Sequence, residues 1–406
     1  MFIVILALFT ASHAAGQETL TAVSLDEAVA VALRHNPTLR AKEYEVQSTR
    51  AGEITAGLRP NPTASYSTEQ LPGGGDAVVQ HTITLAQPIE TGGKRDRRLA
   101  SARAATRVTT LELEDVRRQV IAQVKKAFND VLVAQATLAL AEQNLRTLDE
   151  VERIQRLRAE KGDISELELL RIQVQRFAFE RDATDARQAG RAARIALRTV
   201  MGYGRIQDDF EARGALLFRD IPSDRSALHQ LTLEHRPDLR AAAAARDKAR
   251  ADFDLAGANA WWDVTPQIEY QRIGNANTIG LGVSVPLRIF DRNQGDIART
   301  RAEMDRTRAQ RDAAVNQALS EVDTALSTLR GEREKLRALR EVYLPKAAQA
   351  RDIVEFAYRR GGLSLLDFLD AQRTYRETAL EELRALGNYS SAVYQLEAAV
   401  GGPLEK

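Results

Sequence analysis

The sequence predicts a mainly α-helical protein with a transmembrane β-barrel portion, built from two tandem copies of one unit. The phrase LRHNPTLRA at residues 33–41 returns as LEHRPDLRA at residues 233–241. Residues 94–161 contain neither Gly nor Pro, and a stretch of alternating apolar and polar residues precedes the long helical run of each copy. Because a steady sequence offset indicates repeated structural units, we expect long coiled-coil helices and four β-strands per chain.

The repeats divide the chain into a leader and two halves. We expect a signal peptide over residues 1–15, a first repeat over 16–213 and a second repeat over 214–406. The apolar run Phe2–Phe9, followed by small residues, is typical of a cleaved secretory signal, with a frayed apolar terminus as the alternative. The usual basic residues ahead of the run are missing, so the true start and the cleavage site stay open. No later segment offers the run of about 18 apolar residues that a transmembrane helix needs.

The composition excludes several kinds of protein. Lys and Arg number 57 against 56 Asp and Glu, so a net charge of +1 offers no basic surface for nucleic acid. Cysteine is absent, which excludes disulfides, thiolate metal sites and a lipidated N-terminal cysteine. The histidines are scattered without metal-ligand spacing, and no catalytic constellation is visible. We therefore expect neither an enzyme nor a bound cofactor or metal.

The first copy places one long helix between two half-length helices. Apolar residues between Leu113 and Leu148 recur with a mean spacing of 3.5, the seam of a coiled coil, inside a predicted helix over 94–161. Such a helix is about 100 Å long. Residues 24–58 open on the capping box Ser-x-x-Glu and are expected to form one helix, and residues 166–201 another.

The second copy repeats this arrangement with an interrupted rod. The long run covers 291–360, with half-length partners at 225–255 and 364–400. Gly331 and Pro345 are expected to interrupt the long run, and Pro345 to bend it, because proline removes a backbone donor and crowds the preceding turn. On the helices alone, a soluble periplasmic coiled-coil adaptor or scaffold fits equally well.

Two predicted hairpins favour a membrane protein. Their strands lie at about 61–71 and 78–89, and at about 264–273 and 278–287, with apolar residues on one face and small or polar residues on the other. Strands of about ten residues with this alternation are typical of outer-membrane β-barrels. Four strands cannot close a barrel, and an open edge would leave backbone amides unpaired in lipid. We therefore expect two chains to supply eight strands or three chains to supply twelve.

Two tryptophans, Trp261 and Trp262, come just before the third strand. Aromatic residues are enriched at membrane–water interfaces, so we expect these two to be interfacial aromatics that contact outer-membrane lipid. The alternative is that they pack at the end of the preceding helix.

Taken together and in order, these features resemble TolC-family outer-membrane efflux proteins over nearly the whole mature chain. The resemblance is carried by the doubled Leu-x-His-x-Pro-x-Leu-Arg-Ala phrase and by the strand ends Gln87-Pro88-Ile89 and Val285-Pro286-Leu287. It is also carried by Gly-x-x-Ser-x-Leu followed by an acid, at residues 162–168 and again at 361–367. The segment from Phe356 to Gln372 is similar to the heavy-metal branch in particular.

The resemblance implies a TolC-like homotrimer, with a twelve-stranded barrel in the outer membrane and an α-helical barrel crossing the periplasm. It implies a passive exit duct that works with a periplasmic adaptor and an inner-membrane resistance-nodulation-division pump driven by protons, with heavy-metal cations as the expected cargo. Drug efflux or type I protein secretion are alternatives that the sequence discriminates poorly.

The resemblance also assigns an acidic aperture at the periplasmic end. Asp367 and Asp370 lie three residues apart on one helical face, and Glu168 is the counterpart in the first copy. A ring of such carboxylates would attract cations and raise some carboxylate pKa values through like-charge proximity. The alternative is that these acids only stabilise a helix N-terminus and face solvent.

The turns between the long and the following helices, at 162–166 and 361–364, would form the periplasmic tips. Their glycines are expected to permit tight turns. The residues beside them are expected to hold the closed state or to contact the adaptor, although arginines near a helix C-terminus are equally expected from the helix dipole. These tip residues are Gly162, Gly361, Gly362, Tyr358, Arg359, Arg360 and Arg158.

Overall fold

The computed structural model describes residues 20–71, 78–204, 206–216, 218–221 and 224–404. The predicted signal peptide and the middle of the first hairpin loop lie outside these residues. The chain forms two compact units, each drawn from both sequence repeats. We call them the tip unit, which combines the described part of Met1–Asn36 with Val120–Asp220 and Leu329–Tyr394, and the sheet unit, which combines Pro37–Gln119, Ile221–Thr328 and the described part of Gln395–Lys406. The repeat boundaries themselves stay a prediction.

Long helices dominate both units. The predicted helix over 94–161 is confirmed as α3, Lys94–Glu160, without a break. Helices α3, α7 and α9 contribute residues to both units, α1, α4 and α8 belong to the tip unit, and α2, α5 and α6 belong to the sheet unit. Their bounds are α1 Leu25–His35, α2 Pro37–Gly57, α4 Glu166–Met201, α5 Arg225–His235, α6 Pro237–Asn259, α7 Gln294–Ala338, α8 Leu344–Arg359 and α9 Leu365–Val400. None of the described helices is long and apolar enough to cross a membrane.

The first half-length helix of each copy is broken in two, which corrects the prediction of single runs over 24–58 and 225–255. Asn36, with ψ at 122°, separates α1 from α2, and Arg236, with ψ at 119°, separates α5 from α6. Both residues precede a proline, whose ring disfavours the helical conformation for the residue before it. The capping box at the start of α1 is confirmed, since the backbone N–H of Ser24 donates to the Glu27 carboxylate at 2.8 Å.

The doubled phrase holds each break against the end of a later helix. The Asn36 amide donates to the Val200 carbonyl at 2.7 Å in the tip unit, and the Arg236 guanidinium donates to the Ala399 carbonyl at 3.1 Å in the sheet unit. Gly202 follows the first contact with φ at 94°, and a Cβ there would lie 2.9 Å from the His35 carbonyl oxygen. The two copies thus make the same contact with different donors. We call this contact, from a helix break to the end of a later helix, a latch.

The second long rod differs from the predicted helix over 291–360. Gly331 lies inside α7 without interrupting it, so that part of the prediction is wrong. The interruption is the π-helical segment η1, Leu339–Tyr343, just before Pro345. There the Leu344 N–H donates to the Leu339 carbonyl, five residues back. The wider turn accommodates a proline that cannot donate to the preceding turn.

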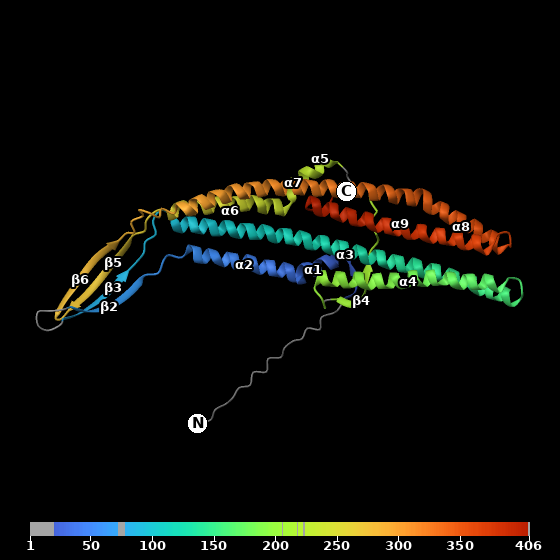
Figure 1. Cartoon of the computed structure of the whole chain (residues 1–406), viewed down its shortest axis with the longest axis horizontal. Helices are drawn as coiled ribbons and strands as arrows, with labels where there is room; N and C mark the ends of the chain where they lie inside the picture. Colours follow the sequence, from blue (N-terminus) through green and yellow to red (C-terminus); the bar gives the residue numbers. More distant parts are fainter. Residues whose placement is uncertain (1–19, 72–77, 205, 217, 222–223, 405–406) are drawn as a thin grey trace, which may run out of the picture. The chain divides into compact units, whose positions relative to one another are not determined.

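The four predicted membrane strands form one antiparallel sheet in the order β2-β3-β5-β6 (Figure 1). The strands are β2 Thr63–Leu71, β3 Val78–Ala86, β5 Thr265–Ile273 and β6 Ala276–Ser284. One row of paired residues crosses all four strands, and its side chains are between 40% and 74% exposed: Tyr66, Ile83, Tyr270 and Ile279. Since neighbouring positions along a strand point to opposite faces, the polar row of Thr84, Glu269 and Gly280 lies on the other face.

The sequence did not predict a second sheet, which lies in the tip unit. β1, Leu20–Ser24, pairs in parallel with β4, Ile206–Arg213. The described residues therefore contain two strands, β1 and β4, besides the four predicted strands of the large sheet. β4 reads Ile-Gln-Asp-Asp-Phe-Glu-Ala-Arg, and only Ile206, Phe210 and Ala212 are buried. Only one face of β4 is buried, and the charged residues of its exposed positions obscure the alternation by which a strand is recognised in a sequence.

Candidate functional site: the helical tips

The two tips of the tip unit are built by the same backbone motif. In the first, the Asp163 N–H donates to the Arg158 carbonyl at 2.9 Å and the Gly162 N–H donates to the Ala159 carbonyl at 3.0 Å. In the second, Gly362 and Gly361 donate to Ala357 and Tyr358 at 2.9 and 3.0 Å. This pair of bonds is the Schellman motif, which needs a left-handed residue after the helix. Gly162 and Gly361 both supply it, each with φ at 78°.

The helices that leave the two turns begin differently. At α9 the Asp367 carboxylate accepts the Ser364 N–H at 3.1 Å and the Ser364 hydroxyl at 2.6 Å, while the Asp367 N–H donates back to that hydroxyl at 3.3 Å. The bonds from the Ser364 hydroxyl and N–H lower the pKa of Asp367. At α4, Ser165 makes no side-chain cap, so Glu168 has no such bond. Asp367 therefore caps its helix.

The two aperture candidates of α9 share an exposed face. Both Asp367 and Asp370 are exposed, and Asp370 forms an ion pair with Arg373 at 2.7 Å. Glu168 is half-buried on α4. A raised carboxylate pKa would be a property of the assembled ring, so the aperture role of these three residues stays a prediction.

Tyr358 lies in the core that joins the two tips. Its ring is 8% exposed and stacks on Phe368 with ring centres 5.0 Å apart. Burial raises the pKa of Tyr358 to about 12, with Arg158 and Glu168 acting in opposite directions. The remaining core residues come from α3, α4 and α9: Leu148, Val151, Ile172, Phe179, Leu365 and Leu369. A gating role for Tyr358 would therefore require this core to rearrange.

The other predicted arginines remain at the surface or partly so. Arg359 is exposed and pairs with Glu355 at 2.6 Å, and the Arg360 guanidinium lies 4.2 Å from the centre of the Phe356 ring. Arg158 is half-buried. Their contact with an adaptor stays a prediction.

A charge network between α3 and α4 escaped the sequence analysis. Glu152 is buried and bonds Arg156 at 2.8 Å and Arg176 at 2.9 Å, and Arg176 also reaches Asp149 at 2.5 Å and Glu180 at 2.7 Å. Burial opposes the charged form, but the bonds from Arg156 and Arg176 lower the pKa of Glu152. The contacts between α3 and α4 cross about 24 positions of sequence, and helical periodicity alone gives no signal for them.

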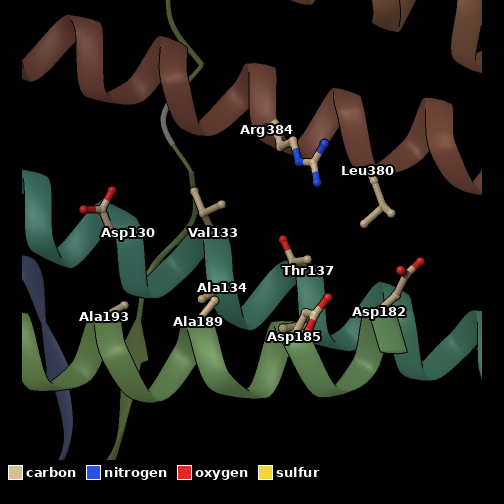
Figure 2. Close-up of a pocket in the computed structure, with 11 residues that line it drawn as sticks. Asp130, Val133, Ala134, Thr137, Asp182, Asp185, Ala189, Ala193, Leu380 and Arg384 are labelled. Atoms are coloured by element: carbon tan, nitrogen blue, oxygen red, sulfur yellow. The ribbon is translucent and has the colours of Figure 1, made fainter. Parts of the chain in front are cut away.

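A groove of about 440 Å³ lies among α3, α4 and α9 in the tip unit (Figure 2). Figure 2 shows Leu380 and Arg384 reaching from α9 towards α3, with Ala189 and Ala193 on α4 below. Asp182 on its wall pairs with Arg376 at 3.5 Å. Across the described residues, no group of three or more His, Cys, Asp or Glu side chains could hold a metal ion.

In the sheet unit, the two tryptophans are exposed and their backbone is tied to the loop before α3. The Trp262 carbonyl accepts the Thr91 hydroxyl, and Lys94 pairs with Asp263 at 2.7 Å. A Cβ at Gly92 would lie 2.9 Å from Trp261 side-chain atoms, so only glycine fits beside that ring. Lipid contact of Trp261 and Trp262 stays a prediction.

Comparison with known proteins agrees with this architecture. The profile of a family described as "Outer membrane efflux protein" matches residues 28–203 and 228–402, once in each repeat. The cobalt-zinc-cadmium resistance protein CzcC of Cupriavidus metallidurans is 28% identical over 390 residues, which cover 95% of this chain and 91% of that protein.

Solved structures share the fold. A membrane protein from Pseudomonas aeruginosa superposes with a TM-score of 0.80 at 20% identity, covering 95% of this chain and 92% of that chain. CusC, whose structures concern transmembrane channel formation, gives 0.79 at 20% identity and covers 94% of each chain. The protein is located in the outer membrane and extends into the periplasm. With both repeats matched, the chain belongs to the outer membrane efflux protein family, whose members are channels and not enzymes.

Proposed function

We propose that three copies of this chain form the outer-membrane duct of a tripartite efflux system that exports heavy-metal cations. The duct is passive, a proton-driven resistance-nodulation-division pump in the inner membrane supplies the energy, and a periplasmic adaptor joins the two. The observation that carries the proposal is the four-stranded sheet, which exposes an apolar face and two open edges.

The sheet supports association of chains. Within the described residues, β2 and β6 each have a neighbour on one side only. An unpaired strand edge in lipid leaves several backbone groups without hydrogen bonds, at a cost of several kcal/mol each. Three sheets joined edge to edge give twelve strands, an even number within the range of outer-membrane barrels.

Helix α4 supports the same assembly from the tip unit. Four apolar residues on one face, Leu167, Leu170, Val174 and Phe177, are 49% to 75% exposed. Their spacing of three or four residues is that of a coiled-coil seam. In a single chain this seam faces solvent, and packing against a second copy would bury it.

The exported cargo is inferred from the similarity to CzcC and from the exposed acid Asp370 at the tip. CzcC is named for resistance to cobalt, zinc and cadmium. Asp370 exposes a carboxylate that no helix cap uses, and a threefold arrangement would bring three copies of it around one axis. Such a ring favours the passage of cations.

The oligomeric state is tested first. The mature protein in detergent should give the mass of three chains by light scattering combined with size exclusion, and should migrate differently on gels before and after heating. A stable monomer without detergent would disprove the duct.

The cargo is tested by complementation. A strain that lacks this gene but keeps its adaptor and pump should become sensitive to cobalt, zinc and cadmium, and the wild-type gene should restore tolerance. Unchanged metal tolerance combined with new sensitivity to drugs would favour drug efflux, and a lost secreted protein would favour type I secretion.

The aperture is tested in planar bilayers. Asp370→Asn removes an exposed charge without touching the α9 cap, so divalent cations should block the conductance less strongly. Asp352→Asn, an exposed acid on α8 that pairs with Arg351, serves as the control. Equal block in all three proteins would remove Asp370 from the aperture.

A further inference from the structure

The tip unit contains a second, smaller cavity, which is lined in part by the tip residues Arg158, Tyr358 and Arg359. It has a volume of about 140 Å³ and lies among α3, α8 and α9. Val151 and the Phe368 ring form apolar walls, and Gln155 and Tyr358 contribute polar groups. The same Tyr358 ring stacks on Phe368, so the cavity borders the core that joins the tips.

Two polar atoms that line this cavity have no hydrogen-bond partner. They are Oε1 of Gln155 and the hydroxyl oxygen of Tyr358. Gln155 is 2% exposed and Tyr358 is 8% exposed, so bulk water does not satisfy either atom. Buried polar groups are nearly always bonded, and an orphan calls for an occupant. The Tyr358 hydroxyl is protonated at neutral pH, as in any tyrosine, and is able to donate.

The charges around the cavity cancel. Arg158 and Arg359 are balanced by Glu150 and Glu355, and one of these pairs, Arg359 with Glu355, is bonded at 2.6 Å. A neutral occupant is therefore favoured over an ion. The volume suits a single aromatic ring, since a cavity of about 150 Å³ holds benzene. An all-apolar cavity of this size stays dry, whereas this one presents an acceptor and a donor.

We propose that this cavity binds a neutral one-ring aromatic molecule that carries a hydroxyl group. The ligand O–H would donate a hydrogen bond to Oε1 of Gln155, and the ligand oxygen would accept a hydrogen bond from the Tyr358 hydroxyl. The ring would pack between Val151 and Phe368. The proposal is independent of the exported cargo, because it concerns a site inside one protomer.

The first test measures binding of phenol to the full-length protein in detergent by ligand-observed NMR. Phenol should bind saturably, with one site per chain. Anisole has the same ring but no O–H, and should bind about tenfold more weakly, as expected for the loss of one buried hydrogen bond. Equal binding of phenol and anisole would overturn the proposal, because simple partitioning into apolar space or detergent predicts it.

The second test uses variants that keep the shape of the cavity. Gln155→Leu should weaken phenol binding about five- to tenfold and leave anisole binding unchanged, because anisole has no O–H to donate to Oε1. Tyr358→Phe should weaken the binding of both ligands, because the oxygen of each accepts from the Tyr358 hydroxyl. Gln135→Leu is the matched control, because Gln135 lies on the same helix outside this cavity and also has an unbonded Oε1. Tyr358→Phe removes one oxygen only. If Gln155→Leu fails to fold, the weaker phenol binding expected for Tyr358→Phe still tests the proposal.

Two further outcomes would overturn the proposal. Absence of any phenol binding would mean that the cavity holds water only. Tighter binding of benzoate than of phenol, abolished by Arg158→Gln, would mean that the site selects an anion and not a neutral ligand.

Discussion

At the scale of single residues, equivalent positions in the two copies have different structural roles. Asp367 closes a capping box at the start of α9, while Glu168, at the matching place in α4, makes no cap. Arg236 replaces Asn36 as the donor at the helix break and adds an ion pair with Glu321 at 2.7 Å. Such differences cannot be read from the repeat phrase, because the phrase records similarity and these roles lie in the positions that differ.

Asp367→Ala should lower the thermal midpoint of unfolding at neutral pH, because α9 loses its cap. The hydrogen bonds from Ser364 hold the pKa of Asp367 below its ordinary value in the folded protein. The carboxylate therefore contributes stability above the unfolded pKa, and this is lost as the pH falls through the folded pKa. The difference in thermal midpoint between wild type and variant should therefore disappear in acid, when unfolding is followed by circular dichroism. Glu168→Ala should show no such difference, and a difference of equal size would contradict the cap.

Arg236→Met should destabilise far more than Asn36→Ala. Arg236 is buried, and its loss strands Asp238, whose pKa it holds down against the effect of burial. The Asp238 side chain is 31% exposed, so the relevant cost is that of losing a hydrogen bond to a charged group, about 1.5–3 kcal/mol for each bond lost, whereas a neutral hydrogen bond contributes about 1 kcal/mol. Denaturant titration of both variants measures the two losses, and similar values would contradict the role of Arg236 as a buried ion-pair partner.

At the scale of elements, much of the architecture follows from periodicity. The Gly- and Pro-free run gave α3 to within one residue, and alternation located all four strands of the large sheet. The breaks at Asn36 and Arg236 were missed although Pro37 and Pro237 stood in the doubled phrase. The π segment lies directly before Pro345, where the sequence predicted a bend and not a wider turn. The pairing of β1 with β4 depends on contacts between distant segments. No local pattern carries those contacts.

The sequence also predicted only part of the structure of the tip. Glycines and serines at both turns indicated where the helices reverse, and the acids of α9 could be placed on one face. The orphaned Gln155 and the charge network around Arg176 could not, because both arise where α3 meets its neighbours.

Two glycines inside helices should respond to alanine with opposite signs. A Cβ at Gly387 of α9 would collide with the side chain of Val133 on α3, whereas nothing lies within 4 Å of one at Gly331 of α7. Gly331→Ala should therefore stabilise by about 0.5–1 kcal/mol, and Gly387→Ala should destabilise by about 1–3 kcal/mol. Melting curves check the signs, and adding Val133→Ala should recover part of the loss at Gly387. Stabilisation by Gly387→Ala would rule out the close approach of α3 and α9.

At the scale of the whole molecule, membership of the efflux family excludes the soluble scaffold that the helices alone allowed. The sheet distinguishes the two alternatives, because its exposed apolar side chains would be unfavourable in water and favourable in lipid.

Ile279→Lys should impair membrane insertion, whereas Thr278→Lys should not. Ile279 belongs to the exposed apolar row, and its neighbour Thr278 lies on the opposite, polar face. A lysine on the lipid face costs about 2–4 kcal/mol near the bilayer midplane. The amount of heat-modifiable protein in the outer-membrane fraction measures the difference, and equal amounts of both variants would contradict the assignment of faces.

The pair of latches at Asn36 and Arg236 also bears on ancestry. Both copies close the same contact, from a helix break to the end of a later helix, so a half-length precursor could have made it alone. Six such halves would bring as many strands of the large sheet as three whole chains, since each half contributes one hairpin. A chain that joins two such halves with different side chains, as Asn36 and Arg236 differ here, presents two non-identical sides to its neighbours.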